Sequence, residues 1–190
     1  MTVGRPRDTA IDDAILLVTW DELNRIGYSA LTMTAVAEGA GIQKPALYRR
    51  WPTKPMLVID ALATHLPSMD YVDRGSLEAD LRFAIEHLAT IWSTPAVRLS
   101  FSPLIADIDT DAEALNAFAE RVMRRRSLAL REALARARER GDLREDAPID
   151  AVADLLEGPL MHRAVLGHAP LDAGLVDSVL TSVLTHLRRP

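Results

Sequence analysis

Apolar residues recur along this chain at intervals of three and four positions, and the strict alternation typical of strands is nearly absent. This period predicts an all-α protein of about nine helices, because one face of each helix then carries most of its apolar side chains. The helices are expected near residues 9–27, 33–40, 44–50, 54–65, 76–93, 95–107, 111–140, 150–166 and 172–188.

Short signals mark several helix ends. Gly27 is a natural stop for the first helix, and Thr32 is placed to cap the second. Pro45 falls in the first turn of the third helix, where a missing N–H group costs nothing. The segment from Pro67 to Gly75 indicates a break between two parts of the chain.

Composition narrows the class of protein. The chain has 190 residues, 48% of them hydrophobic, which allows one good-sized core or a small domain fused to a larger one. It contains no cysteine, which excludes disulfides and cysteine metal sites and fits a reducing compartment. The N-terminus lacks the apolar core of a signal peptide, and no apolar run approaches the roughly 20 residues that span a bilayer. We therefore expect a soluble, cytoplasmic protein with no membrane partner.

Charge is distributed unevenly along the chain, whose formal net charge is −5. Residues 1–66 carry seven Lys or Arg and seven Asp or Glu, so the deficit lies in residues 67–190. The stretch GIQKPALYRRWPTK, residues 41–54, holds four basic residues and lies inside a run, Gly39 to Ile59, with no Asp or Glu. A local basic patch of this kind says more about nucleic-acid binding than the global charge does.

The acid-free run coincides with a short helix, a tight turn and a second short helix, which is the helix-turn-helix arrangement. Small residues in the turn, Ala37, Ala40 and Gly41, allow the two helices to cross closely. The second helix must enter a DNA major groove about 12 Å wide, where carboxylates would be repelled by the flanking phosphates. The cations expected to neutralise phosphates are Lys44, Arg49, Arg50 and Lys54, together with Arg5 and Arg7 on an N-terminal arm.

The segment from Gly27 to Leu62 resembles the DNA-binding domain of the tetracycline-repressor (TetR) family of transcriptional regulators. The resemblance is carried by the glycine that ends the first helix, the Ala-x-x-Ala-Gly turn, and the residues Leu47-Tyr48, Trp51 and Lys54. It implies that Tyr48 and Lys54 grip phosphates and that the groove is faced by Lys44, Ala46, Arg49 and Arg50.

Two positions depart from the family pattern. Gln43 stands where Ser or Thr commonly caps the recognition helix, and it is a poor cap that can instead reach an adenine edge. Pro45 stiffens the start of the same helix. The expected organisation is a helix-turn-helix DNA-binding domain at 1–53, a connecting helix at 54–66, and an effector-binding and dimerisation domain at 67–190.

The last two predicted helices are candidates for a dimer interface. The final helix carries an unbroken apolar stripe that includes Val176, Val179, Leu180, Val183 and Leu184. The preceding helix contributes Leu155, Gly158 and Pro159, and a close helix contact at Gly158 would explain a Gly-Pro pair in mid-helix. The alternative is an ordinary monomer core. In the TetR family two such helices from each subunit form a four-helix interface, which would place two recognition helices about 34–36 Å apart on a palindromic operator.

The long helix predicted at 111–140 has an apolar face with a cation in its middle. Arg126 lies among Leu115, Phe118, Ala119, Val122, Ala129 and Ala133. A buried guanidinium needs a partner, which is either an acid inside the bundle or the anionic head of a small effector. The other arginines of this helix, Arg124, Arg125 and those from Arg131 to Arg140, are expected to be solvated.

The resemblance also implies an effector pocket in the second domain. Candidate lining residues are His87, Trp92, Phe101, Phe118 and Met123, each of which is also compatible with plain core. Because few polar groups are available, an apolar or amphipathic effector is expected. A ligand that favours one separation of the two DNA-reading domains would release the operator.

Catalytic and metal-binding patterns are not found in the sequence. The five histidines show no HExxH spacing, and there is no G-x-S-x-G, no P-loop and no Glu-x-x-His set for a di-metal bundle. We expect no cofactor and no enzyme activity. The rival to a DNA-binding regulator is a ligand-binding helical bundle whose DNA-binding domain is inactive or serves another partner.

Overall fold

The computed structural model describes residues 9–68, 73–144 and 146–187, apart from the side chains of residues 125–127, 129 and 150. Within these ranges every regular element is a helix, as the sequence predicts. The elements are α1 Thr9–Ala30, α2 Met33–Gly39, α3 Lys44–Arg50, α4 Lys54–His65, α5 Leu77–Ser93, α6 Pro95–Arg98, α7 Phe101–Ile108, α8 Ala112–Phe118, a π-helical segment η1 Ala119–Met123, α9 Arg124–Glu139, α10 Ile149–Leu166 and α11 Ala173–Leu187.

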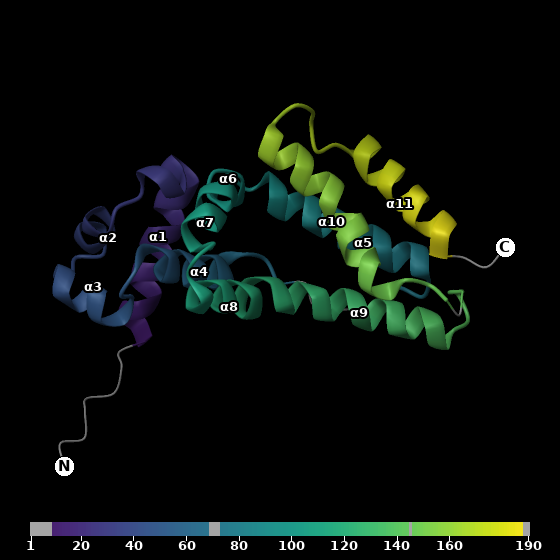
Figure 1. Ribbon diagram of the computed structural model, residues 1–190, viewed down its shortest axis with the longest axis horizontal. Helices are drawn as coiled ribbons and strands as arrows, with labels where there is room; N and C mark the ends of the chain where they lie inside the picture. Colours follow the sequence, from purple (N-terminus) through teal and green to yellow (C-terminus); the bar gives the residue numbers. More distant parts are fainter. Residues whose placement is uncertain (1–8, 69–72, 145, 188–190) are drawn as a thin grey trace, which may run out of the picture.

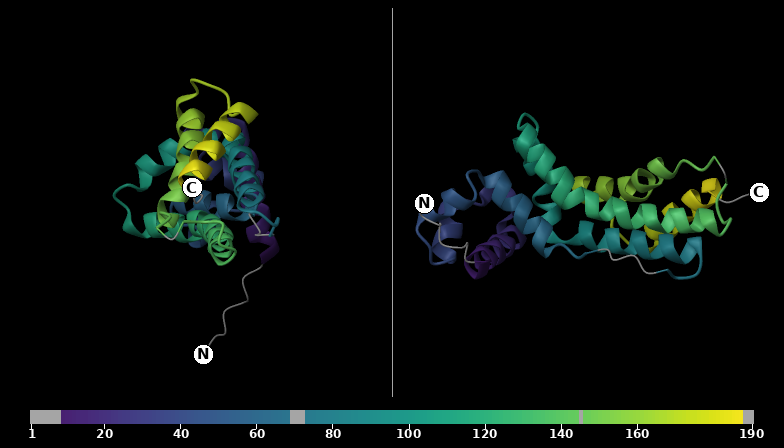
Figure 2. Two further views of the ribbon diagram at one scale, coloured as in Figure 1. Left: turned by 90° about the vertical axis from the view of Figure 1, so that its right-hand side faces the viewer. Right: turned by 90° about the horizontal axis from the view of Figure 1, so that it is seen from below.

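The molecule is elongated, and its helices gather at two ends (Figure 1). Helices α1, α2 and α3 form the first end, while α5, α9, α10 and α11 form a bundle at the second (Figures 1 and 2). Helix α4 packs on α1 and also on α8 and η1, so it joins the two ends. None of the helices in the described ranges is long and apolar enough to cross a membrane.

The N-terminal end confirms the local sequence signals. Thr32 caps α2 by accepting a hydrogen bond from the backbone N–H of Ala35 at 3.1 Å. Gly27 interrupts the helical backbone of α1 with φ 72° and ψ 176°, after which one further turn follows. A Cβ atom at Gly27 would lie 2.8 Å from the Cβ of Leu99, so only glycine allows the two chain segments to approach this closely.

Two predicted helices differ from expectation. The helix expected at 95–107 is two helices, α6 and α7, that meet at Leu99 and Ser100. Pro103 explains the break, because it has no N–H to bond the carbonyl of Leu99 and is tolerated only in the first turn of a new helix. The helix expected at 111–140 is divided by η1, where the N–H of Arg124 bonds the carbonyl of Ala119, five residues earlier.

The π-helical segment also corrects the predicted apolar face. One extra residue in this turn changes the phase of the helix, so the buried face is not continuous across η1. The buried side chains of α8 and η1 are Ala114, Ala117, Phe118 and Val122, and those of α9 are Leu130, Ala133, Leu134 and Ala137. The sequence predicts Leu115 and Ala119 on the buried face, but both are exposed. The side chain of Arg126 lies outside the described residues.

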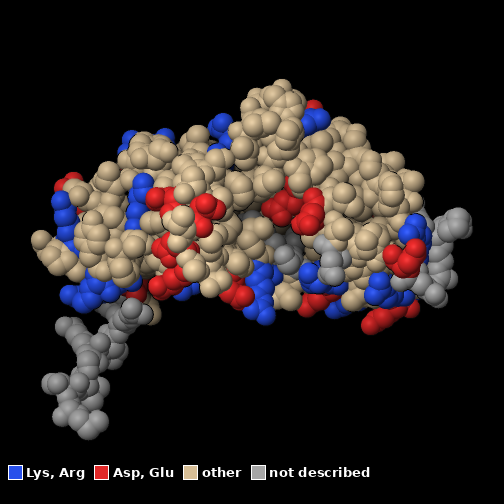
Figure 3. Space-filling model, viewed as in Figure 1, with Lys and Arg blue, Asp and Glu red and all other residues tan. Residues whose placement is uncertain are grey.

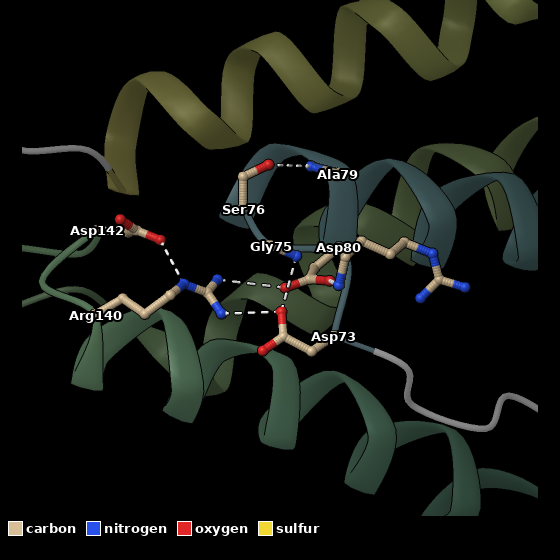
Figure 4. A network of polar contacts seen from close by, with 8 residues as sticks. Asp73, Gly75, Ser76, Ala79, Asp80, Arg140 and Asp142 are labelled. Atoms are coloured by element: carbon tan, nitrogen blue, oxygen red, sulfur yellow. Dashed lines mark hydrogen bonds and ion pairs between the residues drawn. The ribbon is translucent and has the colours of Figure 1, made fainter.

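One of the arginines expected to be solvated holds the far end of the bundle together. Arg140 donates to Asp142 at 2.9 Å, to Asp73 at 3.3 Å and to the almost fully buried Asp80 at 3.4 Å (Figure 4). Asp80 also accepts from the backbone N–H of Arg74 at 2.9 Å. Arg140 therefore joins the end of α9 to the start of α5, because a buried carboxylate requires such partners.

Candidate nucleic-acid interface and ligand cavity

Helix α3 presents a row of exposed polar residues at one end of the molecule. Gln43, Lys44, Pro45, Tyr48 and Arg49 are exposed, and Tyr48 retains 47% of its accessible surface. On the opposite side of α3, Leu47 is fully buried in the core of this end. Gln43 occupies the N-cap position without a side-chain capping bond, which leaves its amide available to a partner.

Lys44 and Arg49 are the available cations of this helix. Neither has a hydrogen-bond or ion-pair partner among the described residues. Basic side chains lie along the edge of the end that carries α2 and α3, while the largest acidic patches in the same view lie nearer the middle (Figure 3). A phosphate backbone approaching α3 would thus meet cations first.

Arg50 is placed differently from the expectation that it faces the groove. Its Nε lies 2.5 Å from Oδ1 of Asp12 in α1, and its Nη1 donates to the carbonyl of Ala46 at 3.1 Å. Only 16% of its side chain is exposed. In this arrangement Arg50 ties α3 to α1.

Lys54 is also engaged within the protein. Its Nζ donates to the carbonyl of Tyr28 at 3.1 Å and lies 4.0 Å from the centre of the Tyr28 ring. A cation at this position satisfies carbonyls at the end of α1 and interacts favourably with the helix dipole. Arg5 and Arg7, predicted on the N-terminal arm, lie outside the described residues.

Polar contacts join the helix-turn-helix end to α6 and α7. The hydroxyl of Tyr28 donates to Asp107 of α7, and the Oδ1 of Asn24 accepts from the N–H of Ala96 at 3.1 Å. Burial, together with the Asp107 carboxylate, raises the pKa of Tyr28 above its usual range. The phenol therefore stays neutral and continues to donate to Asp107.

A small apolar cavity lies between the two ends. It has a volume of about 20 Å³ and is lined by Leu62, Leu66, Trp92, Val97, Phe101, Leu104, Phe118, Val122 and Met123. Trp92 and Phe101 meet edge to face with their ring centres 4.8 Å apart, and Phe118 lies 6.4 Å from Phe101. The indole N–H of Trp92 donates to Glu157 of α10 at 3.0 Å, so the lining offers a ligand mainly apolar surface.

The cavity brings together four of the predicted lining residues, Trp92, Phe101, Phe118 and Met123. His87 lies elsewhere, with its ring stacked on Phe83 and its Nε2 3.3 Å from the carbonyl of Pro67. The described residues contain no group of three or more His, Asp or Glu placed to hold a metal ion.

The face formed by α10 and α11 carries an apolar groove of about 440 Å³, lined by Leu155, Pro159, Ser178, Val179, Ser182, Val183 and His186. Leu155 is 50% exposed there, and a Cβ at Gly158 would meet no atom within 4 Å. The close helix contact expected at Gly158 is therefore not made within one protomer. Val176, Leu180 and Leu184 are buried in the protomer itself.

Two family models match the chain and leave few residues between them. Residues 15–61 match "Bacterial regulatory proteins, tetR family", and residues 71–183 match "Tetracyclin repressor-like, C-terminal domain". The second match alone covers more than half of the chain.

Full-length relatives agree with these models. The DNA-binding transcriptional repressor TetR of Mycobacteroides abscessus is 33% identical over 181 residues, which cover 93% of each chain. The uncharacterized HTH-type transcriptional regulator YdeS of Bacillus subtilis is 29% identical over 164 residues, 86% of this chain and 82% of the relative. The solved structure of the TetR family transcription regulator SCO0332 superposes with a TM-score of 0.72 and 27% identity, covering 94% of this chain and 99% of that one.

Proposed function

Because this chain belongs to the TetR family and is a DNA-binding transcriptional regulator, we propose that it is a homodimeric repressor of a palindromic operator. A small apolar or amphipathic effector that enters the cavity between the two ends releases the operator. The repressor acts in the cytoplasm, and the face of α3 that carries Gln43, Lys44, Tyr48 and Arg49 reads the DNA.

The observation that carries this proposal is the exposed, acid-free face of α3. Gly39 to Ile59 contains no carboxylate, and the exposed cations Lys44 and Arg49 have no partner among the residues that the structure describes. Each phosphate that such a cation neutralises adds about one unit to the salt dependence of binding. A face that is only solvated would not need to exclude Asp and Glu, and it would not need a fixed helix-turn-helix scaffold.

DNA binding is tested by fluorescence anisotropy with labelled DNA from upstream of the protein's own gene, a random duplex, and two salt concentrations. We expect tighter, saturable and salt-sensitive binding to the upstream DNA. Arg49→Ala should lower the salt slope by about two units per dimer if each protomer loses one phosphate contact. Arg138→Ala is the matched control, because Arg138 is exposed in the last turn of α9, in the bundle and not in the helix-turn-helix. Equal effects of the two substitutions would contradict the proposal that α3 contacts the DNA.

Dimerisation is supported by the apolar groove between α10 and α11. A second copy that covers this groove would bury the half-exposed Leu155 and bring a helix against the open backbone at Gly158. We expect Leu155→Arg to produce monomers in sedimentation equilibrium, since a charge would be forced into the apolar interface. Leu128→Arg is the control, because Leu128 is also 50% exposed but lies on α9. Dimers that survive Leu155→Arg would contradict this interface.

The effector site is supported by the aromatic cavity, whose volume of about 20 Å³ holds little more than one water-sized sphere. A ligand must therefore move the walls apart, which couples binding to a change of shape. The dye 1-anilinonaphthalene-8-sulfonate, an amphipathic aromatic anion, serves as a probe. Phe101→Trp should weaken dye binding by filling the cavity, and unchanged dye binding would argue against the cavity as the site.

A further inference from the structure

The π-helical segment η1 lies at the boundary between the cavity and the helix-turn-helix end. It follows α8 directly, and two of its residues, Val122 and Met123, line the cavity. Turns of π-helix are rare and short, and they occur frequently at functional sites. A turn that contains one extra residue can relax to α-helix only by shifting the helix on one side of it.

The same segment reaches the recognition helix through a single carboxylate. Arg121 of η1 places its Nη1 2.5 Å from Oδ1 of Asp60 in α4. The other oxygen of Asp60 accepts the indole N–H of Trp51 at 2.9 Å. Trp51 is the C-cap residue of α3, so one carboxylate connects the cavity wall to the end of the helix that reads DNA.

The two halves of this contact differ in burial. Trp51 is 6% exposed, and its indole has only one N–H to donate, so it depends on an acceptor such as Asp60. Arg121 is 46% exposed, and exposed ion pairs contribute little to folding stability. Arg121 can therefore leave Asp60 without unfolding the protein, while the position of Trp51 responds to what happens at Asp60.

We propose that η1 is the element that transmits effector binding to DNA, through the contacts Arg121–Asp60–Trp51. A ligand that opens the cavity against Val122 and Met123 displaces η1, separates Arg121 from Asp60 and loosens the anchor of α3. This inference rests on the proposed function, and it adds the residues that carry the regulation. A ligand changes operator affinity only as far as it prefers the separated arrangement.

The test is a double-mutant cycle on operator affinity that needs no effector. Arg121→Ala breaks the contact directly, and Phe101→Trp mimics a ligand by filling the cavity. Each single variant should raise the operator Kd by about tenfold, a typical size for coupling between sites. The double variant should be no weaker than the weaker single variant, because both act through one contact.

Arg124→Ala is the matched control for charge and position. Arg124 follows η1 directly, is exposed, and pairs with Glu120 one turn away in the same helical stretch. Its removal should leave the operator Kd unchanged. Circular dichroism establishes that each variant is folded, and Val97→Ile, which adds one methyl group to the cavity lining, replaces Phe101→Trp if that variant does not fold.

The outcomes separate the inference from the function on which it rests. Wild-type protein that binds no specific DNA overturns the proposed function. If the wild type binds but the effects in the double variant are additive, or Arg121→Ala and Arg124→Ala have equal effects, only the proposed role of the contacts Arg121–Asp60–Trp51 is overturned. Non-additive losses confined to Arg121 and the cavity support it.

Discussion

Replacing Gly27 with alanine tests the junction between the two ends of the molecule. The backbone there has φ 72° and ψ 176°, a region that is essentially restricted to glycine. The new Cβ would lie 2.8 Å from the Cβ of Leu99 and 3.1 Å from its carbonyl oxygen, well inside the usual contact distance of about 3.5–4.0 Å.

The cost has two parts that a control variant separates. Backbone strain at such a residue costs about 1–3 kcal/mol, and forcing extra atoms into a packed site costs about 1–3 kcal/mol. We therefore expect Gly27→Ala to lower the free energy of unfolding by about 4 kcal/mol. Gly41 also has a positive φ, 65°, but a Cβ there meets no atom within 4 Å, so Gly41→Ala should cost only about 1–2 kcal/mol.

Urea unfolding followed by circular dichroism measures both values, at one protein concentration so that the proposed dimerisation affects the variants equally. Leu99→Ala should not rescue Gly27→Ala, because alanine keeps the Cβ that makes the contact. If Gly27→Ala costs no more than Gly41→Ala, the contact with Leu99 is not what requires glycine, and this reasoning fails.

Three further predictions concern stability. Burial and Asp107 raise the pKa of Tyr28. The neutral phenol therefore contributes to the free energy of unfolding in full below the unfolded pKa of about 10, and this contribution is lost as pH rises through the folded pKa. Tyr28→Phe should therefore reduce the loss of stability seen in alkaline urea titrations. Asp80→Ala removes a buried acceptor of Arg140 and should cost about 2 kcal/mol in urea unfolding. Thr32→Ala should cost about 1 kcal/mol by the same measurement, and Thr32→Ser should restore most of it.

Local chemistry made much of the N-terminal end predictable. The bounds of α3 follow from Pro45 at its start and Trp51-Pro52 at its end, and the cap of α2 follows from Thr32. Each of these signals acts within one turn of the residue that carries it. These local signals could therefore locate the helices that carry the candidate interface.

Partners distant in the sequence could not be predicted in this way. The sequence predicts Arg50 and Lys54 as surface cations. In the structure Arg50 pairs with Asp12, 38 positions away, and Lys54 donates to the carbonyl of Tyr28, 26 positions away. The sequence does hold a signal for the contact with Arg121, because Asp60 is the single acid of its helix and follows the apolar run Met56 to Ile59.

The predicted apolar face of the helix expected at 111–140 was partly wrong for a different reason, which is the π-helical turn. A search at 3.6 residues per turn assumes one phase along a helix, and η1 changes that phase partway. The expected face therefore omitted Leu134, which is buried after the turn.

The three tryptophans give the protein built-in optical reporters. Trp92 is 2% exposed in the cavity wall, Trp51 donates to Asp60 at the end of α3, and Trp20 stacks on His65 with ring centres 5.7 Å apart. Proteins that retain one tryptophan at a time would show, in emission wavelength and quenching, events at the cavity, at the end of α3 and in the α1–α4 packing separately. The order of the three signals after rapid mixing with an effector would give the direction in which the change travels through the molecule.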